Sequence, residues 1–436
     1  MDMRRGGHAP GNGFGYNGTM RPPQRFKNRV RKSGPLTLLK YIGPGFLVTV
    51  GFIDPGNWAA NVAAGAGFGY RLLWMVTLST LMLILLQHNA AHLGIATGLC
   101  LSEASSTYFP KWISRVLLST AMAASVSTAL AELLGAAIGL NMLFRLPLPL
   151  GVILSALAAG YMLLFNNYRR LEKWILAFVS LIAFSFLYEL SLVTIHWPAA
   201  LSGWVLPAFP HSSLPIIMSV LGAVVMPHNI FLHSEIIQSR QWNLKEERVI
   251  RKQLRFEFLD TLLAMLAGWA INSAMIIMAA AVFFSRCIVV TELPQAEATL
   301  RPLLGSGAAI VFALALLFSG FSSSITAGMA GGSIFAGIFK KPFAVTDRRS
   351  RQGILITLGG GLLAAFLVHN PFQGLIWSQI VLSMQLPFTI APLIVLTSSK
   401  KVMGSYANKL PGWIVLWGLA LVIAVLNALL LIQICR

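Results

Sequence analysis

Two short stretches of the sequence combine a helix-breaking proline with side chains that can bind a cation. They are DPGN at 54–57 and MPHN at 226–229, and both have the form x-Pro-x-Asn. Asp54 offers a carboxylate, Asn57 a carbonyl oxygen and Met226 a thioether sulfur. Mg²⁺ and Ca²⁺ prefer shells made of oxygen alone, whereas a thioether favours softer ions such as Fe²⁺, Co²⁺, Cd²⁺ and, to a smaller degree, Mn²⁺. The two stretches therefore predict a site for a divalent transition metal.

Both stretches lie in the middle of long apolar runs. A proline there removes an amide donor and interrupts a helix, and in hydrocarbon the freed carbonyl groups need partners. Unwound backbone near Gly51 and Ala223 would offer carbonyl oxygens to the same cation. A carboxylate such as Asp54 is costly inside a membrane and is a functional candidate for that reason.

The composition of the chain requires a membrane around these elements. Of its 436 residues 56% are hydrophobic and 11% are charged, whereas soluble domains carry about 25% charged residues. We expect an all-α polytopic membrane protein with eleven transmembrane helices. The apolar runs lie near 41–66, 72–97, 114–142, 148–166, 174–195, 214–238, 257–284, 306–339, 353–369, 374–398 and 411–434.

The distribution of positive charge predicts an orientation. The net charge is +19, and with the N-terminus inside, the inner segments hold 28 of the 33 Lys and Arg residues. This asymmetry follows the positive-inside rule, so it indicates a membrane protein and not a nucleic-acid partner. We expect a cytoplasmic N-terminus, an outer C-terminus and a location in the plasma membrane. Residues 1–34 are basic and rich in Gly and Pro, which predicts a disordered cytoplasmic tail.

The two broken runs predict an inverted repeat. They open two blocks of five runs each, and because five is odd, the second block must be inverted relative to the first. Transporters of this kind bind their substrate between two discontinuous helices. The expected divisions are a first repeat at 35–200, a second at 201–400 and a peripheral eleventh helix at 401–436.

Longer motifs add a resemblance to a known family. DPGN and AVVMPH resemble the signature motifs of the Nramp divalent metal transporters, and matches extend through GYRLLWMV, AELLGAA, HNIFLHS, SGFSSSITAGMAG and SQIVLSMQLPF. The resemblance implies a leucine-transporter-like fold and a manganese or iron importer. It also implies side-chain ligands Asp54, Asn57 and Met226. Backbone oxygens would come from Gly51 and Ala223, and Gln379 would complete or close the site.

The resemblance also implies proton coupling, but two positions depart from the pattern. Ala129 and Gln352 stand where many members of the family carry an Asp and the second Arg of a pair. Candidates for a proton relay or gate are His228, Glu132, Arg351 and His233. Two mechanisms therefore stay open, proton-stimulated uptake and weakly coupled uptake.

Other classes of function find less support in the sequence. His88 and His92 lie four residues apart, but the run is HNAAH and lacks the Glu of HExxH, so we expect them to hydrogen-bond neighbouring helices or the cytoplasmic interface. We predict no enzyme activity and no cofactor besides the transported ion. The expected partners are divalent metal ions, protons and lipid, without nucleic acid, in a monomer or weak dimer. The main alternative is a cation-coupled amino-acid or amine carrier on the same fold, and a passive channel also stays open.

Overall fold

Helices account for the regular structure of the part of the chain described by the computed structural model. This part comprises residues 53–165, 184, 190–191, 193–239, 247–288, 290, 292 and 306–434. The predicted tail, Gly51 and most of the run at 174–195 lie outside it. The main helices are α2 (Pro55–Phe68), α3 (Leu73–Thr97), α4 (Leu101–Tyr108), α5 (Lys111–Phe144), α6 (Leu148–Phe165), α8 (Trp197–Val205), α9 (Leu214–Val225), α10 (Pro227–Ser239), α11 (Glu247–Val282), α13 (Ser306–Ile338), α14 (Arg348–Leu367), α15 (Pro371–Ser398) and α17 (Leu410–Ile434). Short elements join them, namely η3 (Gly69–Leu72), η4 (Phe284–Arg286), α16 (Lys400–Met403) and η5 (Gly404–Tyr406).

The first predicted break is the start of α2. Asp54 has an extended backbone, with φ −74° and ψ 162°, and its side chain caps the helix by accepting from the backbone N–H of Asn57 at 2.5 Å. Pro55 occupies the first helical position, where its fixed φ suits a helix and its missing N–H costs nothing. The helix ends at Gly69, whose φ of 62° favours glycine.

The second predicted break lies between α9 and α10. Met226 separates them with φ 13° and ψ 101°, which is far from helical. Pro227 explains this geometry, because a proline disfavours the helical conformation of the residue before it. The predicted interruption of the sixth run is therefore confirmed at its predicted residue.

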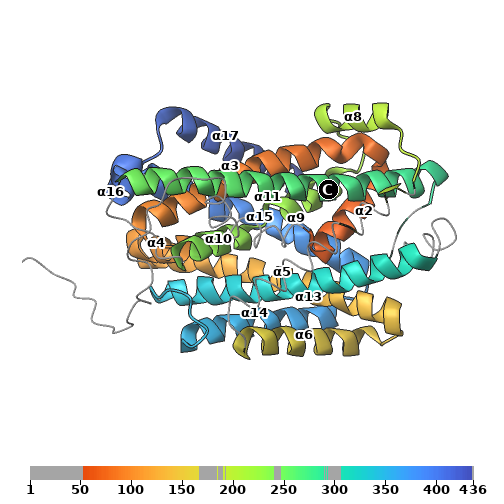
Figure 1. Ribbon diagram of the computed structural model, residues 1–436, viewed down its shortest axis with the longest axis horizontal. Coiled ribbons are helices and arrows are strands. Elements are labelled where there is room, and N and C mark those ends of the chain that lie inside the picture. The colour runs from red at the N-terminus through yellow and green to blue at the C-terminus, as the bar shows by residue number, and fades with distance from the viewer. Residues whose placement is uncertain are drawn as a thin grey trace, which may run out of the picture. The chain divides into compact units, whose positions relative to one another are not determined.

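Four helices run side by side along one part of the bundle, α5, α13, α14 and α6 (Figure 1). Small residues permit their close approach. Gly320 of α13 lies against the backbone of Glu132 and Ala136 in α5, and Gly139 of α5 lies against Leu317. α15 packs against α2, α5 and α9, so it connects this group with both broken helices.

Within the described residues, nine stretches are long and apolar enough to cross a membrane. The longest, Pro55–Thr97, has 43 residues and contains both α2 and α3. The predicted number of eleven is not decided by these residues, since most of the fifth run lies outside them. α17 presents many apolar side chains outward, which suits a peripheral position against lipid.

Candidate metal-binding site

Asp54 is fully buried at the first break. Its carboxyl group lies beside that of Glu132 on α5. Its Oδ2 receives no hydrogen bond from an N–H or hydroxyl group of the described residues. Two adjacent buried carboxyl groups cannot both carry an uncompensated negative charge. A proton or a bound cation must therefore offset the charge at this position.

The break at Asp54 is held in place by neighbouring helices. The carbonyl oxygen of Ile53 accepts from the indole Nε1 of Trp58 at 3.1 Å and from the hydroxyl of Ser319 on α13. The ring of Pro55 packs where Gly135 of α5 leaves room, because a Cβ at Gly135 would overlap it. These contacts satisfy a freed carbonyl group in the way that a discontinuous membrane helix requires.

Gln379 lies between the two broken helices. Its side-chain amide covers Gly56 in the first turn of α2, and its backbone lies against Gly222 near the end of α9. Its Nε2 donates to Ser378 Oγ at 3.3 Å, while its buried Oε1 has no hydrogen-bond partner among the described residues. The structure thus places Gln379 at both breaks, and its side-chain oxygen is free to bind a cation.

The second break contributes Met226 and Ala223, which are both fully buried. The sulfur of Met226 accepts from the side-chain amide of Asn229 at 3.2 Å, and its side chain packs against Ala124 and Leu382. Among the described residues, no hydrogen bond joins this sulfur to Asp54.

The carbonyl groups of the two predicted backbone ligands, Gly51 and Ala223, are expected to be free for the same physical reason. In a regular helix the carbonyl group of one residue accepts from the N–H four residues later. The partners of Gly51 and Ala223 would be Pro55 and Pro227, which have no N–H. Each proline therefore frees the carbonyl group that the family resemblance assigns to the metal. Gly51 itself lies outside the described residues.

One face of α5 contacts both breaks, a feature that we did not predict from the sequence. Thr128 Oγ1 is 3.1 Å from Nδ1 of His228 on α10. Glu132 follows one turn later and meets Asp54, and Gly135 receives Pro55. Positions i, i+4 and i+7 lie on one side of a helix. Their spacing was visible in the sequence, but their partners were not.

The other predicted relay residues lie apart from this cluster. Arg351 is exposed and donates to the carbonyl group of Val345 at 2.8 Å. Ala129 is buried, and a Cβ at Gly361 of α14 would overlap it, so the two helices are closely packed at this position. His233 is buried, and its Nε2 lies 3.3 Å from Oε1 of Glu257 on α11.

Hydrogen bonds between helices bear out the structural role expected for His88 and also hold the first broken helix. His88 bonds to Glu257 on a neighbouring helix at 2.6 Å, as predicted for a structural role. Asn272 of α11 accepts from Asn61 of α2 at 2.5 Å, which ties the first broken helix to α11. Among the described residues, no three His, Cys, Asp or Glu side chains are arranged to hold a metal ion. The candidate site therefore combines one carboxylate with neutral oxygens and a sulfur.

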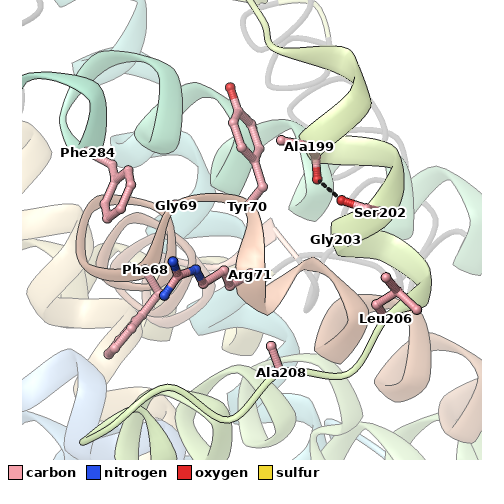
Figure 2. A pocket seen from close by; sticks show the side chains of 10 residues that line it. All are labelled: Phe68, Gly69, Tyr70, Arg71, Ala199, Ser202, Gly203, Leu206, Ala208 and Phe284. Carbon is pink, nitrogen blue, oxygen red and sulfur yellow. Dashed lines mark hydrogen bonds between the residues drawn. The ribbon is translucent and has the colours of Figure 1, made fainter.

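A separate cavity of about 380 Å³ lies at the end of α2. Figure 2 shows Tyr70 and Arg71 from η3, Ser202 from α8 and Phe284 from η4 at its walls. This cavity contains none of the predicted metal ligands, so it is distinct from the candidate site.

Comparison with known proteins agrees with the motifs at these breaks. Residues 45–433 match the family model described as Nramp, natural resistance-associated macrophage protein-like. The chain belongs to the Nramp family. A curated relative, the divalent metal cation transporter MntH of Caldanaerobacter subterraneus subsp. tengcongensis, is 37% identical and aligns over 88% of this chain and 91% of its own. MntH of Xanthomonas campestris pv. campestris is 39% identical over 90% of each chain.

Solved structures agree with the Nramp assignment. A manganese transporter of Eremococcus coleocola, crystallised with an aromatic bis-isothiourea substituted compound, has a TM-score of 0.76 and 29% identity, and the match covers 92% of this chain and 88% of that one. A nucleobase-cation-symport-1 family transporter in a closed conformation has a TM-score of 0.59, with 81% and 77% coverage. Its identity of 16% indicates the fold alone. The predicted all-α, leucine-transporter-like fold class is thus confirmed.

Proposed function

We propose that this Nramp chain imports Mn²⁺ by alternating access, binding the ion between the two broken helices. Transport of divalent metal ions follows from the family and from the MntH relatives, and the chain is a transporter and not an enzyme. The observation that carries the proposed site is the position of Gln379, which touches the first turn of α2 and the last turn of α9.

The proposed ligands are Asp54, Asn57, Met226 and Gln379, with carbonyl oxygens of Gly51 and Ala223. One anionic oxygen offsets part of the charge of a divalent ion, and the neutral oxygens replace water. The Met226 sulfur disfavours Mg²⁺ and Ca²⁺, which bind oxygen shells. Mn²⁺ is preferred over Fe²⁺, Cd²⁺ and Co²⁺ in this proposal because the similar solved structure from Eremococcus coleocola is a manganese transporter.

Protons enter the proposal through His228 and Glu132. Glu132 lies on the face of α5 that touches the two breaks, and His228 contacts the same face through Thr128, so both are near the proposed ion site. Proton-stimulated import is the reading that Nramp membership favours. Ala129 favours the alternative of weak coupling, because an alanine at this position cannot accept a proton or form an ion pair. Arg351 and His233 remain candidates for gating.

The proposed orientation places the N-terminus in the cytoplasm and the C-terminus outside, in the plasma membrane. This orientation is supported by the charge distribution, because it places 28 of the 33 Lys and Arg residues in segments on the cytoplasmic side of the membrane. An amino-acid or amine carrier is not favoured, because the MntH relatives are divalent metal cation transporters.

Uptake into proteoliposomes tests the proposal. Purified protein would be offered Mn²⁺, Fe²⁺, Cd²⁺, Mg²⁺ and Ca²⁺ in turn, with a pH dye inside the liposomes. We expect Mn²⁺ uptake, little Mg²⁺ uptake, and internal acidification if protons are coupled. Asp54→Asn should abolish uptake, whereas Asp347→Asn, which changes an Asp outside the site, should not. Mn²⁺ uptake without acidification would reject proton symport, and equal uptake by Asp54→Asn would reject the site.

A further inference from the structure

The second asparagine of the two x-Pro-x-Asn motifs is not among the proposed ligands. At the first break Asn57 follows Asp54 by three residues. At the second break Asn229 follows Met226 by the same interval, and it lies in the first turn of α10, fully buried. An inverted repeat makes corresponding residues of its halves counterparts at one site. Asn229 is therefore expected to serve the same site as Asn57.

In both breaks the asparagine is hydrogen-bonded to the side chain three residues before it. The backbone N–H of Asn57 donates to Oδ1 of Asp54 at 2.5 Å. The side-chain Nδ2 of Asn229 donates to the sulfur of Met226 at 3.2 Å, and the backbone N–H of Asn229 donates to the Met226 carbonyl oxygen at 3.1 Å. Each asparagine thus fixes the side chain of a proposed ligand.

The orientation of the Asn229 amide follows from its contact with Met226. Reversal of the amide would place its oxygen against the sulfur, and two acceptors cannot form a hydrogen bond. Oδ1 of Asn229 has no hydrogen-bond partner among the described residues, so it does not anchor the amide there. A buried polar atom without a partner is destabilising. The hydrogen bond from Nδ2 to the sulfur is therefore the contact that keeps the amide in this orientation.

This hydrogen bond gives the sulfur of Met226 a direction. A methionine side chain has three rotatable bonds and adapts to many surroundings. Its apolar contacts with Ala124 and Leu382 fill space but do not distinguish one lone pair of the sulfur from the other. The N–H of Asn229 engages one lone pair and leaves the other for an ion. Proteins commonly orient a metal ligand by a hydrogen bond from a neighbouring residue.

We propose that Asn229 is a positioning residue that directs the Met226 sulfur toward the ion and so sets the preference of the site for soft metals. The inference rests on the proposed function, because it requires Met226 to be a ligand. A site whose sulfur is not held in place resembles a site made of oxygen alone, which suits harder ions. Binding of the softer Cd²⁺ should therefore depend on Asn229 more than binding of Mn²⁺ does.

Equilibrium binding of Cd²⁺ and of Mn²⁺ to the full chain in detergent tests this role. Asn229→Ala should lower the ratio of Cd²⁺ affinity to Mn²⁺ affinity by about fivefold, the effect expected from the loss of one hydrogen bond. X-ray absorption of bound Cd²⁺ should show a sulfur ligand in the native protein and a weaker sulfur contribution in the variant. Asn89→Ala is the matched control and should keep the native ratio, because Asn89 is a buried asparagine that donates to Thr397 outside the proposed ligand set.

A double substitution separates positioning from a general effect on stability. In a Met226→Leu background the sulfur is absent, so Asn229→Ala should cause no further change in the affinity ratio. Asn229→Leu covers the case in which Asn229→Ala does not fold, since leucine is close to asparagine in shape and removes the unpartnered oxygen. Asn229→Leu should lower the ratio as Asn229→Ala does.

Failure of the inference and failure of the proposed function give different results. A native ratio in both Asn229 variants, beside a lowered ratio in Met226→Leu, would overturn the inference and leave the proposed site intact. A further fall when Asn229→Ala is added to Met226→Leu would also overturn it, since Asn229 would then act without the sulfur. Cd²⁺ binding that is unchanged in both Asp54→Asn and Met226→Leu would reject the proposed site, and the inference with it.

Discussion

The side-chain amide of Gln379 lies directly over Gly56, where any Cβ would overlap its Nε2. Gln379 comes from α15 and Gly56 from the first turn of α2, 323 positions earlier in the chain. The absence of a side chain at Gly56 thus lets an amide from another helix approach the backbone beside Asp54. The position of the buried Gln379 Oε1 depends on this approach.

Gly56→Ala should weaken Mn²⁺ uptake by displacing Gln379. The amide is the end of a flexible side chain, so the protein should fold while the amide moves from the site. We expect the KM for Mn²⁺ to rise about tenfold, equivalent to about 1.4 kcal/mol, in initial-rate uptake assays. Gly67→Ala is the matched control on the same helix, because a Cβ there meets nothing within 4 Å. Equal KM values for the two variants would contradict the assigned role of Gln379.

Gly222→Ala should destabilise the fold as well as impair transport. A Cβ at Gly222 would overlap the backbone oxygen of Gln379, and a backbone cannot turn aside as a side chain can. Overpacking of this kind costs about 1–3 kcal/mol. We expect a lower melting temperature in detergent than for Gly418→Ala, whose Cβ would meet nothing within 4 Å. An unchanged melting temperature would show that α9 and α15 can separate freely.

Met226→Leu should reduce discrimination between Mn²⁺ and Ca²⁺. Leucine keeps a similar apolar volume but has no sulfur, so the change isolates ligation from packing. We expect the ratio of Mn²⁺ to Ca²⁺ uptake to fall by about tenfold, or about 1.4 kcal/mol. Met218→Leu, at a buried methionine of the same broken helix, should leave the ratio unchanged. A thioether role at Met226 would be rejected if both substitutions gave the native ratio.

Two cysteines should differ in their reaction with a maleimide. Cys287 is exposed, whereas Cys100 is buried, and burial, followed by the nearby Glu235 and Glu103, raises the pKa of the Cys100 thiol well above its usual value. Because the thiolate is the reactive form, a raised pKa leaves little of it at neutral pH. In a Cys435→Ser background we expect rapid labelling of Cys287 near pH 7 and none of Cys100.

Peptide mass spectrometry would locate the label on each cysteine. Labelling in denaturant provides the control, since both thiols should then react. Rapid native labelling of Cys100 would mean that the region between α3 and α4 opens in solution.

The sequence by itself determined the two breaks, the membrane class and the family. A proline acts on its own backbone and on the carbonyl group four residues earlier, so Pro55 and Pro227 could be interpreted without knowledge of their neighbours. The interruption at Met226 and the capping by Asp54 appear where this local physics places them. The exposure of the Arg351 side chain, by contrast, could not be predicted from its motif.

Only the tertiary structure decided which residues meet at and near the breaks. Ser319 with Ile53, Thr128 with His228, and His88 with Glu257 join positions at least 100 residues apart in the chain. Such pairs depend on how whole helices pack, and helical periodicity indicates which face of a helix is buried but not which helix covers it. Glu257 illustrates the consequence. In the sequence it is one acidic residue near the start of an apolar run. Only the structure shows that its carboxylate contacts histidines on two other helices.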